Sequence, residues 1–179
     1  MSSKAEQPWI LKFDDCPEGH TRLDFAVGAE ELDLSAEGFT FPQPLEVRLT
    51  VARAFETFTV EGEIGCTVAG ECCRCLERTE QQVMADTRLL LQRKDATAEE
   101  VEAVQDEEME ILRPGTDSFD MRPSLREDVL LELPLRVYCK ENCLGMCTQC
   151  GQNLNSGSCA CEAESQDPRW AALNELKFS

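Results

Sequence analysis

Residues 45–51, LEVRLTV, and residues 57–68, TFTVEGEIGCTV, decide how the first half of this chain folds. In both runs apolar side chains alternate with polar ones, which is the period of a strand that buries one face. Gly62 falls in phase with the apolar positions of the second run. The same phase places Cys66 on the apolar face, where a thiol usually serves as a small core side chain. The pattern therefore predicts two long neighbouring strands.

A third alternating run follows at 82–92, and shorter candidate strands lie at 9–13 and 22–27. Runs of this kind joined by short turns favour antiparallel pairing. We expect residues 1–94 to form an antiparallel β domain, either a small sheet or an open barrel.

The segment 95–120 interrupts this pattern with a concentration of acidic residues. It holds ten acidic side chains against the single base Arg113, which is half of the formal charge of −18 on the chain. A block of like charge is typical of a solvated helix or mobile loop, and it can also serve as an arm for a basic partner. We therefore expect an acidic linker or arm here.

Helical spacing returns after Pro123, where Leu125, Val129, Leu130 and Leu133 repeat before Pro134. Residues 121–138 are expected to place a core helix on the sheet. A short terminal helix is predicted after Asp167-Pro168, within a last unit spanning 139–179. Together these elements predict an α+β fold.

Composition excludes several classes of protein. The excess of 35 acidic over 17 basic residues disfavours nucleic-acid binding over most of the surface. No run of about 18 apolar residues is present, and no signal peptide opens the chain, so we expect a cytoplasmic protein without a membrane span. The single histidine, His20, leaves little for histidine-based catalysis. We do not expect an enzyme.

The 11 cysteines are the candidate functional residues of this chain. A reducing compartment keeps cysteines as free thiols or metal ligands. The clearest unit is Cys147-Thr148-Gln149-Cys150-Gly151, because two thiolates at this spacing can grip one Zn²⁺. Cys159 and Cys161 can complete a tetrahedron. This set is expected to form a zinc site.

A second site is possible from Cys72 and Cys75 together with Cys139 and Cys143. It would clamp the sheet to the C-terminal module. The spacing leaves exchanges open: Cys143 could join Cys147 and Cys150, or Cys73 could replace a neighbour. We expect one or two zinc ions.

The C-terminal module has few large aliphatic side chains to offset its chain entropy, which favours a structural metal. Four thiolates would close each site, so its role would be structural. A thiol-disulfide centre at Cys72 and Cys75 is the alternative, although such centres commonly lie at a helix N-terminus and strands are expected on both sides here.

Several motifs occur together in a fixed order along the chain. They are Glu71-Cys72-Cys73-Arg74-Cys75-Leu76, Asp117 to Asp120 leading into Leu125 to Leu133-Pro134, Cys139-x3-Cys143-Leu144-Gly145-x-Cys147-x2-Cys150-Gly151-x-Asn153-Leu154-Asn155, Cys159-x-Cys161 and Asp167-Pro168-Arg169. In this combination the chain resembles the bacterial YceD family.

The resemblance implies a role in ribosomal RNA accumulation and biogenesis of the large ribosomal subunit. For so acidic a chain we expect indirect action, in which it binds a basic ribosomal protein or an assembly intermediate. Direct binding of ribosomal RNA through Arg74, Arg78, Arg88 and Arg93 is the runner-up, and a structural adaptor without ribosomal contact is a third possibility. The sequence does not fix the oligomeric state.

Overall fold

The structure, a computed structural model, describes residues 7–94 and 109–161. In chain order its elements are β1 (Ile10–Lys12), η1 (Phe13–Asp15), β2 (Gly19–Val27), η2 (Ala29–Leu32), β3 (Phe39–Thr40), β4 (Leu45–Ala54), β5 (Thr57–Glu71), β6 (Arg78–Arg93), β7 (Met109–Leu112), β8 (Ser118–Asp120) and α2 (Arg122–Glu132). The alternating runs fold as predicted into β4, β5 and β6. The broadly α+β fold is confirmed.

The main sheet is open and has six strands, in the order β2-β4-β5-β6-β7, with β3 paired to β5. Neighbours from β2 to β6 are antiparallel, whereas β7 runs parallel to β6. This last pairing differs from the antiparallel sheet that we expected. It arises because the chain returns after β6 and adds β7 to the free edge. A separate two-stranded sheet joins β1 to β8.

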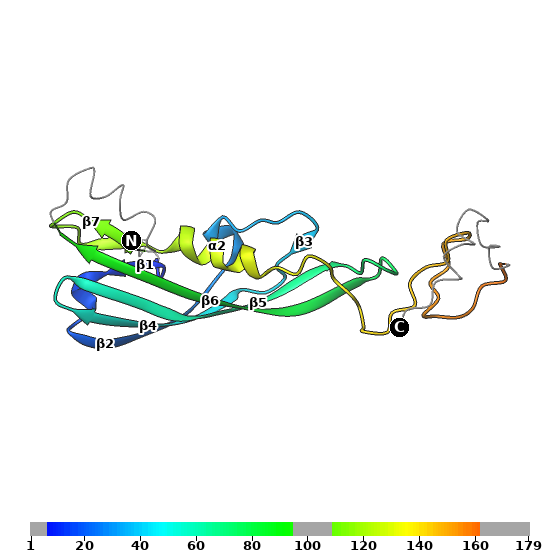
Figure 1. Ribbon diagram of the computed structural model, residues 1–179, viewed down its shortest axis with the longest axis horizontal. Helices are drawn as coiled ribbons and strands as arrows, with labels where there is room; N and C mark the ends of the chain where they lie inside the picture. The colour runs from blue at the N-terminus through cyan, green and yellow to red at the C-terminus, as the bar shows by residue number, and fades with distance from the viewer. Residues whose placement is uncertain (1–6, 95–108, 162–179) are drawn as a thin grey trace, which may run out of the picture.

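Strands β5 and β6 form a long hairpin whose turn reaches toward the cysteine-rich segment (Figure 1). Their pairing continues from Thr57 with Gln92 to Glu71 with Arg78. The hairpin therefore carries residues 72–77 away from the core and presents them at one end of the main sheet.

Gly62 sits opposite Leu49, where β4 and β5 approach each other closely. A Cβ at this position would collide with the backbone carbonyl of Arg48 and would lie 2.8 Å from the Cα of Leu49. Because backbone atoms cannot give way as a side chain does, only glycine fits here. The predicted inward phase of Gly62 thus corresponds to a close backbone contact.

The core lies between the inward face of the main sheet and the elements that cover it. Phe58, Val60 and Ile64 of β5 are fully buried, and Phe13 packs on Phe58 with ring centroids 4.4 Å apart. Cys66 belongs to the same cluster, as its phase predicted. Burial of each such large side chain contributes about 1.5–3 kcal/mol. This apolar cluster is what holds the sheet together.

Helix α2 lies against β6 and buries Leu125 and Val129 (Figure 1). It begins after Asp120, whose Oδ1 accepts a hydrogen bond from the backbone N–H of Arg122 at 3.0 Å. The hydrogen bonds and charge of Arg122 lower the pKa of the Asp120 carboxyl. The helix ends before Pro134, as expected, and delivers the chain to Cys139.

Within the predicted acidic segment, residues 109–120 contribute β7 and β8, and residues 95–108 lie outside the described residues. The predicted terminal helix also lies outside them. The expected domain boundaries remain a prediction. No helix in the described part of the chain has the length and apolar character that crossing a membrane requires.

Candidate metal centres

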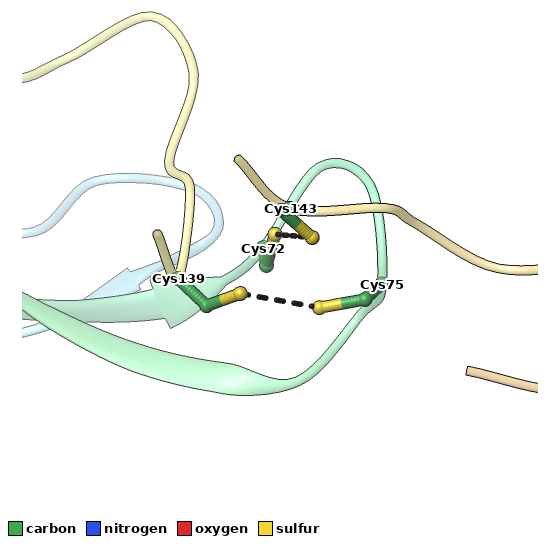
Figure 2. A group of neighbouring side chains, drawn as sticks. All are labelled: Cys72, Cys75, Cys139 and Cys143. Atoms are coloured by element: carbon green, nitrogen blue, oxygen red, sulfur yellow. Dashed lines mark hydrogen bonds between the residues drawn. The ribbon is translucent and has the colours of Figure 1, made fainter. Parts of the chain in front are cut away.

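Four cysteines from two distant segments meet at the β5–β6 turn (Figure 2). Cys72 and Cys75 come from that turn, and Cys139 and Cys143 follow α2. Their sulfur atoms all lie within 4.8 Å of one another, and we call these residues the first set. Cys72, Cys75 and Cys143 are buried, and Cys139 is half-buried.

The sulfur spacing of the first set fits one tetrahedral ion. The Sγ atoms of Cys72 and Cys143 are 3.8 Å apart, and those of Cys75 and Cys139 are 3.5 Å apart. A disulfide needs about 2.05 Å. Four thiolates at about 2.3 Å from a central Zn²⁺ lie roughly 3.8 Å from one another. The donor set and its spacing are therefore compatible with zinc.

The turn itself is held by backbone hydrogen bonds. The N–H of Cys72 donates to the carbonyl of Glu77 at 2.9 Å, and the N–H of Leu76 donates back to the carbonyl of Cys72 at 2.9 Å. Leu76 closes the turn at φ 59°, a conformation that is unusual for a branched side chain. The turn is therefore fixed in a tight loop around the two sulfurs.

Arg74 joins this turn to the C-terminal segment. Its Nη1 donates to the carbonyls of Cys143 at 3.1 Å and Glu141 at 3.4 Å, and its guanidinium lies 4.9 Å from the ring centroid of Tyr138. The N–H of Cys73 also donates to the carbonyl of Val137 at 2.9 Å. The two halves of the first set are thus held together by contacts that do not involve sulfur.

The thiols of the first set differ strongly in acidity. Burial raises the pKa of Cys72, but backbone N–H groups that donate to its sulfur outweigh this and lower the pKa to about 6. Burial and the neighbouring Cys75 and Cys143 raise the pKa of Cys139 to about 12. At neutral pH one sulfur is therefore a thiolate while another holds its proton, so four thiolates require a bound cation.

A second set lies in the C-terminal module. The sulfur atoms of Cys147, Cys150, Cys159 and Cys161 also lie within 4.8 Å of one another. Cys150 is exposed and the other three are half-buried. These eight cysteines form the same two sets of four that the spacing suggested, although the binding of an ion by either set stays a prediction.

The first pair of the second set sits on a tight turn. The N–H of Gly151 donates to the carbonyl of Cys147 at 2.9 Å, and the N–H of Cys147 donates to the carbonyl of Gln152 at 2.8 Å. Gly151 has a φ of 72°, which suits glycine. Backbone N–H groups of Cys150 and Gln149 lower the pKa of Cys147 to about 6, whereas the neighbouring Cys150 and burial raise that of Cys161 to about 12.

The remaining cysteines stay outside both sets. Cys73 is exposed, and Cys16 and Cys66 are buried in the main core. Cys143 joins Cys72 rather than Cys147, so the exchanges that the spacing left open do not occur in this geometry.

Asn155 reaches the first set although it lies within the second module. Its Nδ2 donates to the sulfur of Cys143 at 3.3 Å across twelve positions of sequence. The spacing of cysteines gives no hint of this contact. The Asn153-Leu154-Asn155 motif beside them is the one signal in the sequence.

Comparison with known proteins gives a family match and curated relatives. Residues 60–177 match the family described as large ribosomal RNA subunit accumulation protein YceD. An uncharacterised protein of Mycobacterium tuberculosis (strain ATCC 25618 / H37Rv) is 33% identical over 132 residues, which cover 74% of this chain and 61% of that protein. No solved structure gives a significant match.

A plant relative carries the family description in its name. The large ribosomal RNA subunit accumulation protein YCED homolog 1, chloroplastic, of Arabidopsis thaliana is 26% identical over 158 residues, which cover 75% of this chain and 49% of that protein. The chain thus spans about half to three fifths of the length of these relatives. The chain belongs to the YceD family.

Proposed function

We propose that this chain is a non-enzymatic factor that supports ribosomal RNA accumulation and biogenesis of the large ribosomal subunit. It acts by binding a basic ribosomal protein or an assembly intermediate. The observation that carries the proposal is the family match over residues 60–177, whose description names large-subunit ribosomal RNA accumulation. The name of the Arabidopsis relative supports the same role.

Two structural zinc ions complete the fold in this proposal. Cys72, Cys75, Cys139 and Cys143 hold one ion, and Cys147, Cys150, Cys159 and Cys161 hold the other. Zinc bound by four thiolates has no open position for substrate, so it supplies cross-linking rather than catalysis.

We call the β5–β6 turn together with residues 139–161 the tip. The way the tip packs supports a bound metal. Its buried cluster consists of Cys72, Cys75 and Cys143, with Cys139 and Met146 packed against it. Leu144, a large aliphatic side chain of this region, is 66% exposed. Such a cluster buries too little apolar surface to offset the entropy of ordering the chain, whereas a structural zinc contributes on the order of 10 kcal/mol.

The charge of the chain supports a basic partner. The formal charge is −18, and half of it falls within residues 95–120. This negative charge repels RNA phosphates and speeds association with a positively charged partner. Such a partner is held away from non-specific RNA contacts until it is assembled.

The contacts of the four arginines weigh against the RNA-binding alternative. Arg74 donates to two backbone carbonyls, and Arg78 donates to the hydroxyl of Thr40 at 3.0 Å. Arg88 pairs with Glu61, and Arg93 pairs with Glu56 with its side chain only 15% exposed. These guanidinium groups are already engaged within the protein. They do not form a free basic surface of the kind that binds phosphates.

The thiol-disulfide alternative also lacks support from the geometry. Cys72 and Cys75 are only 0% and 4% exposed, and they lie in a strand-to-strand turn. A redox centre needs an accessible thiolate, commonly at a helix N-terminus. The pair instead faces Cys139 and Cys143 (Figure 2).

Titration of individual large-subunit ribosomal proteins into the purified chain tests the proposal. We expect a complex whose affinity falls as salt is raised from 50 to 500 mM. Neutralising Glu99, Glu100 and Glu102 with glutamine should weaken it, whereas neutralising Glu61, Glu63 and Asp86 on β5 and β6 is the matched control. Absence of a salt-sensitive complex with every protein tested contradicts the proposal, and a shift of ribosomal RNA fragments in a gel would favour direct RNA binding.

A further inference from the structure

The amide of Asn155 connects the second cysteine module to the first set. Asn155 lies in the loop between Cys150 and Cys159, two members of the second set. Its Nδ2 donates to the sulfur of Cys143 at 3.3 Å, and its Oδ1 accepts the N–H of Leu144 at 2.9 Å. One side chain from the second module therefore contacts both a sulfur and the adjoining backbone of the first set.

The orientation of this amide is fixed from within the second module. The Oδ1 of Asn153 accepts hydrogen bonds from the backbone N–H of Asn155 at 2.9 Å and from its Nδ2 at 2.8 Å. Both donor hydrogens and the acceptor of the Asn155 amide are thus used, which leaves one way to place the group. Asn153 in turn forms a β-bridge with Met146, the residue before Cys147.

The backbone also ties the two modules together at this point. The N–H of Leu154 donates to the carbonyl of Gly145 at 2.9 Å, and the N–H of Met146 donates to the carbonyl of Arg74 at 3.0 Å. A Cβ on Gly145 would lie 3.1 Å from the carbonyl oxygen of Arg74, and Gly145 has a φ of 77°. The loop that bears Asn155 therefore packs onto the turn that bears Cys72 and Cys75.

We infer that Asn155 is a positioning residue that couples the two sets, so that an ion held by the second set raises the affinity of the first set for its own ion. This inference rests on the metal binding proposed above. An ion on the second set fixes both ends of the loop that presents Asn155. The amide is then already in place to donate to Cys143. Binding of an ion by the first set therefore no longer includes the entropy cost of ordering this side chain.

Coupling of this kind is reciprocal, so an ion on the first set must raise the affinity of the second by the same factor. Loss of a hydrogen-bond partner of a metal ligand typically weakens affinity about 10- to 100-fold. Coupling between two sites typically amounts to about 5- to 150-fold. We therefore expect a coupling factor within that range.

Competition for Zn²⁺ against a chromophoric chelator measures the factor on the full chain. Cys159→Ala with Cys161→Ala leaves the first set, and Cys72→Ala with Cys75→Ala leaves the second. The coupling factor is a ratio of association constants. It is the overall constant of the unmodified chain for two ions divided by the product of the constants measured for the two variants. The result expected is about 5 to 150, and a factor of one overturns the inference.

Asn155→Asp identifies the residue that carries the coupling. Aspartate keeps the Oδ1 that accepts from Leu144 but replaces the donor to Cys143 with a carboxylate oxygen. We expect the factor to fall to near one in this variant. Asn142→Asp is the matched control, because Asn142 is exposed and its replacement adds the same charge beside Cys143. This variant should leave the coupling factor unchanged.

The outcomes separate this inference from the proposal of metal binding. If each set binds zinc but the factor is one, or if Asn155→Asp leaves it unchanged, the inference fails while metal binding stands. If the unmodified chain binds no zinc, both fail. Far-ultraviolet circular dichroism of each variant monitors the sheet, whose core Asn155 does not join.

Discussion

The sheet and the cysteine-rich tip lie at opposite ends of one hairpin and are stabilised in different ways. Around β4, β5 and β6 the chain buries large apolar side chains such as Phe58, Val60 and Ile64. At the turn of the same hairpin, the buried cluster is made of cysteines with Met146 beside them. A region with little apolar surface can still adopt a defined structure when its sulfurs bind an ion, since that binding replaces hydrophobic burial.

The largest expected effect is that of metal removal. Chelation of zinc should unfold the tip, at a cost on the order of 10 kcal/mol for each ion, and leave the sheet folded. Hydrogen exchange followed by mass spectrometry checks this: protection should disappear in 139–161 and persist in β4 to β6. Re-addition of Zn²⁺ is the control and should restore it. Retained protection of the tip in the metal-free chain would show that it does not depend on an ion.

Lowering the pH should weaken zinc binding by both sets. Cys139 and Cys161, with pKa values raised to about 12, hold protons at neutral pH that the ion must displace. Below pH 6, Cys72 and Cys147, with pKa values lowered to about 6, bind protons as well. Affinity should therefore fall with falling pH by at least about tenfold per unit for each set, and more steeply below 6.

Calorimetric titration of Zn²⁺ in buffers of different ionisation enthalpy counts the protons released. At least one proton per ion is expected at pH 7.5. Binding that releases none, or an affinity that stays constant from pH 8 to 6, would contradict the assignment of these thiols as ligands.

A substitution in the sheet should destabilise the sheet and leave zinc binding by the tip unchanged. Gly62→Ala should destabilise the sheet by about 1–3 kcal/mol, because its Cβ meets backbone atoms of β4 that cannot yield. Gly65→Ala is the matched control, since there the nearest atom is the sulfur of the flexible Met84 side chain at 3.2 Å. Denaturant unfolding compares the two variants, and native mass spectrometry should find their zinc content unchanged. Equal destabilisation by both substitutions would refute the backbone contact.

The smallest effect is expected at the junction of the two regions. Arg74→Lys removes the planar group that binds the carbonyls of Cys143 and Glu141 and covers Tyr138, so the first set should bind zinc several-fold more weakly. Arg78→Lys loses only a contact to Thr40 and serves as the control. Chelator competition measures both. If the two variants bind zinc equally well, Arg74 does not support the first set.

Sequence patterns identified the strands and the helix because their signals are local. The alternation in 45–51 and 57–68 predicted β4 and β5, and the spacing of Leu125 and Val129 predicted α2. The parallel addition of β7 to β6 had no such signal, because β7 is only four residues long and its pairing depends on where the chain returns. Edge pairing of this kind is decided by the free edge that the rest of the sheet leaves open.

At the candidate site, the sequence by itself determined which cysteines are close enough along the chain to form pairs, since two residues between thiols set the geometry of a turn. Only the tertiary structure decided that Cys72 meets Cys143 across 71 positions and Cys75 meets Cys139 across 64. It also placed Asn155 against Cys143. The physical reason is that local spacing fixes the shape of each turn, whereas the β5–β6 hairpin and α2 fix which turns are brought together.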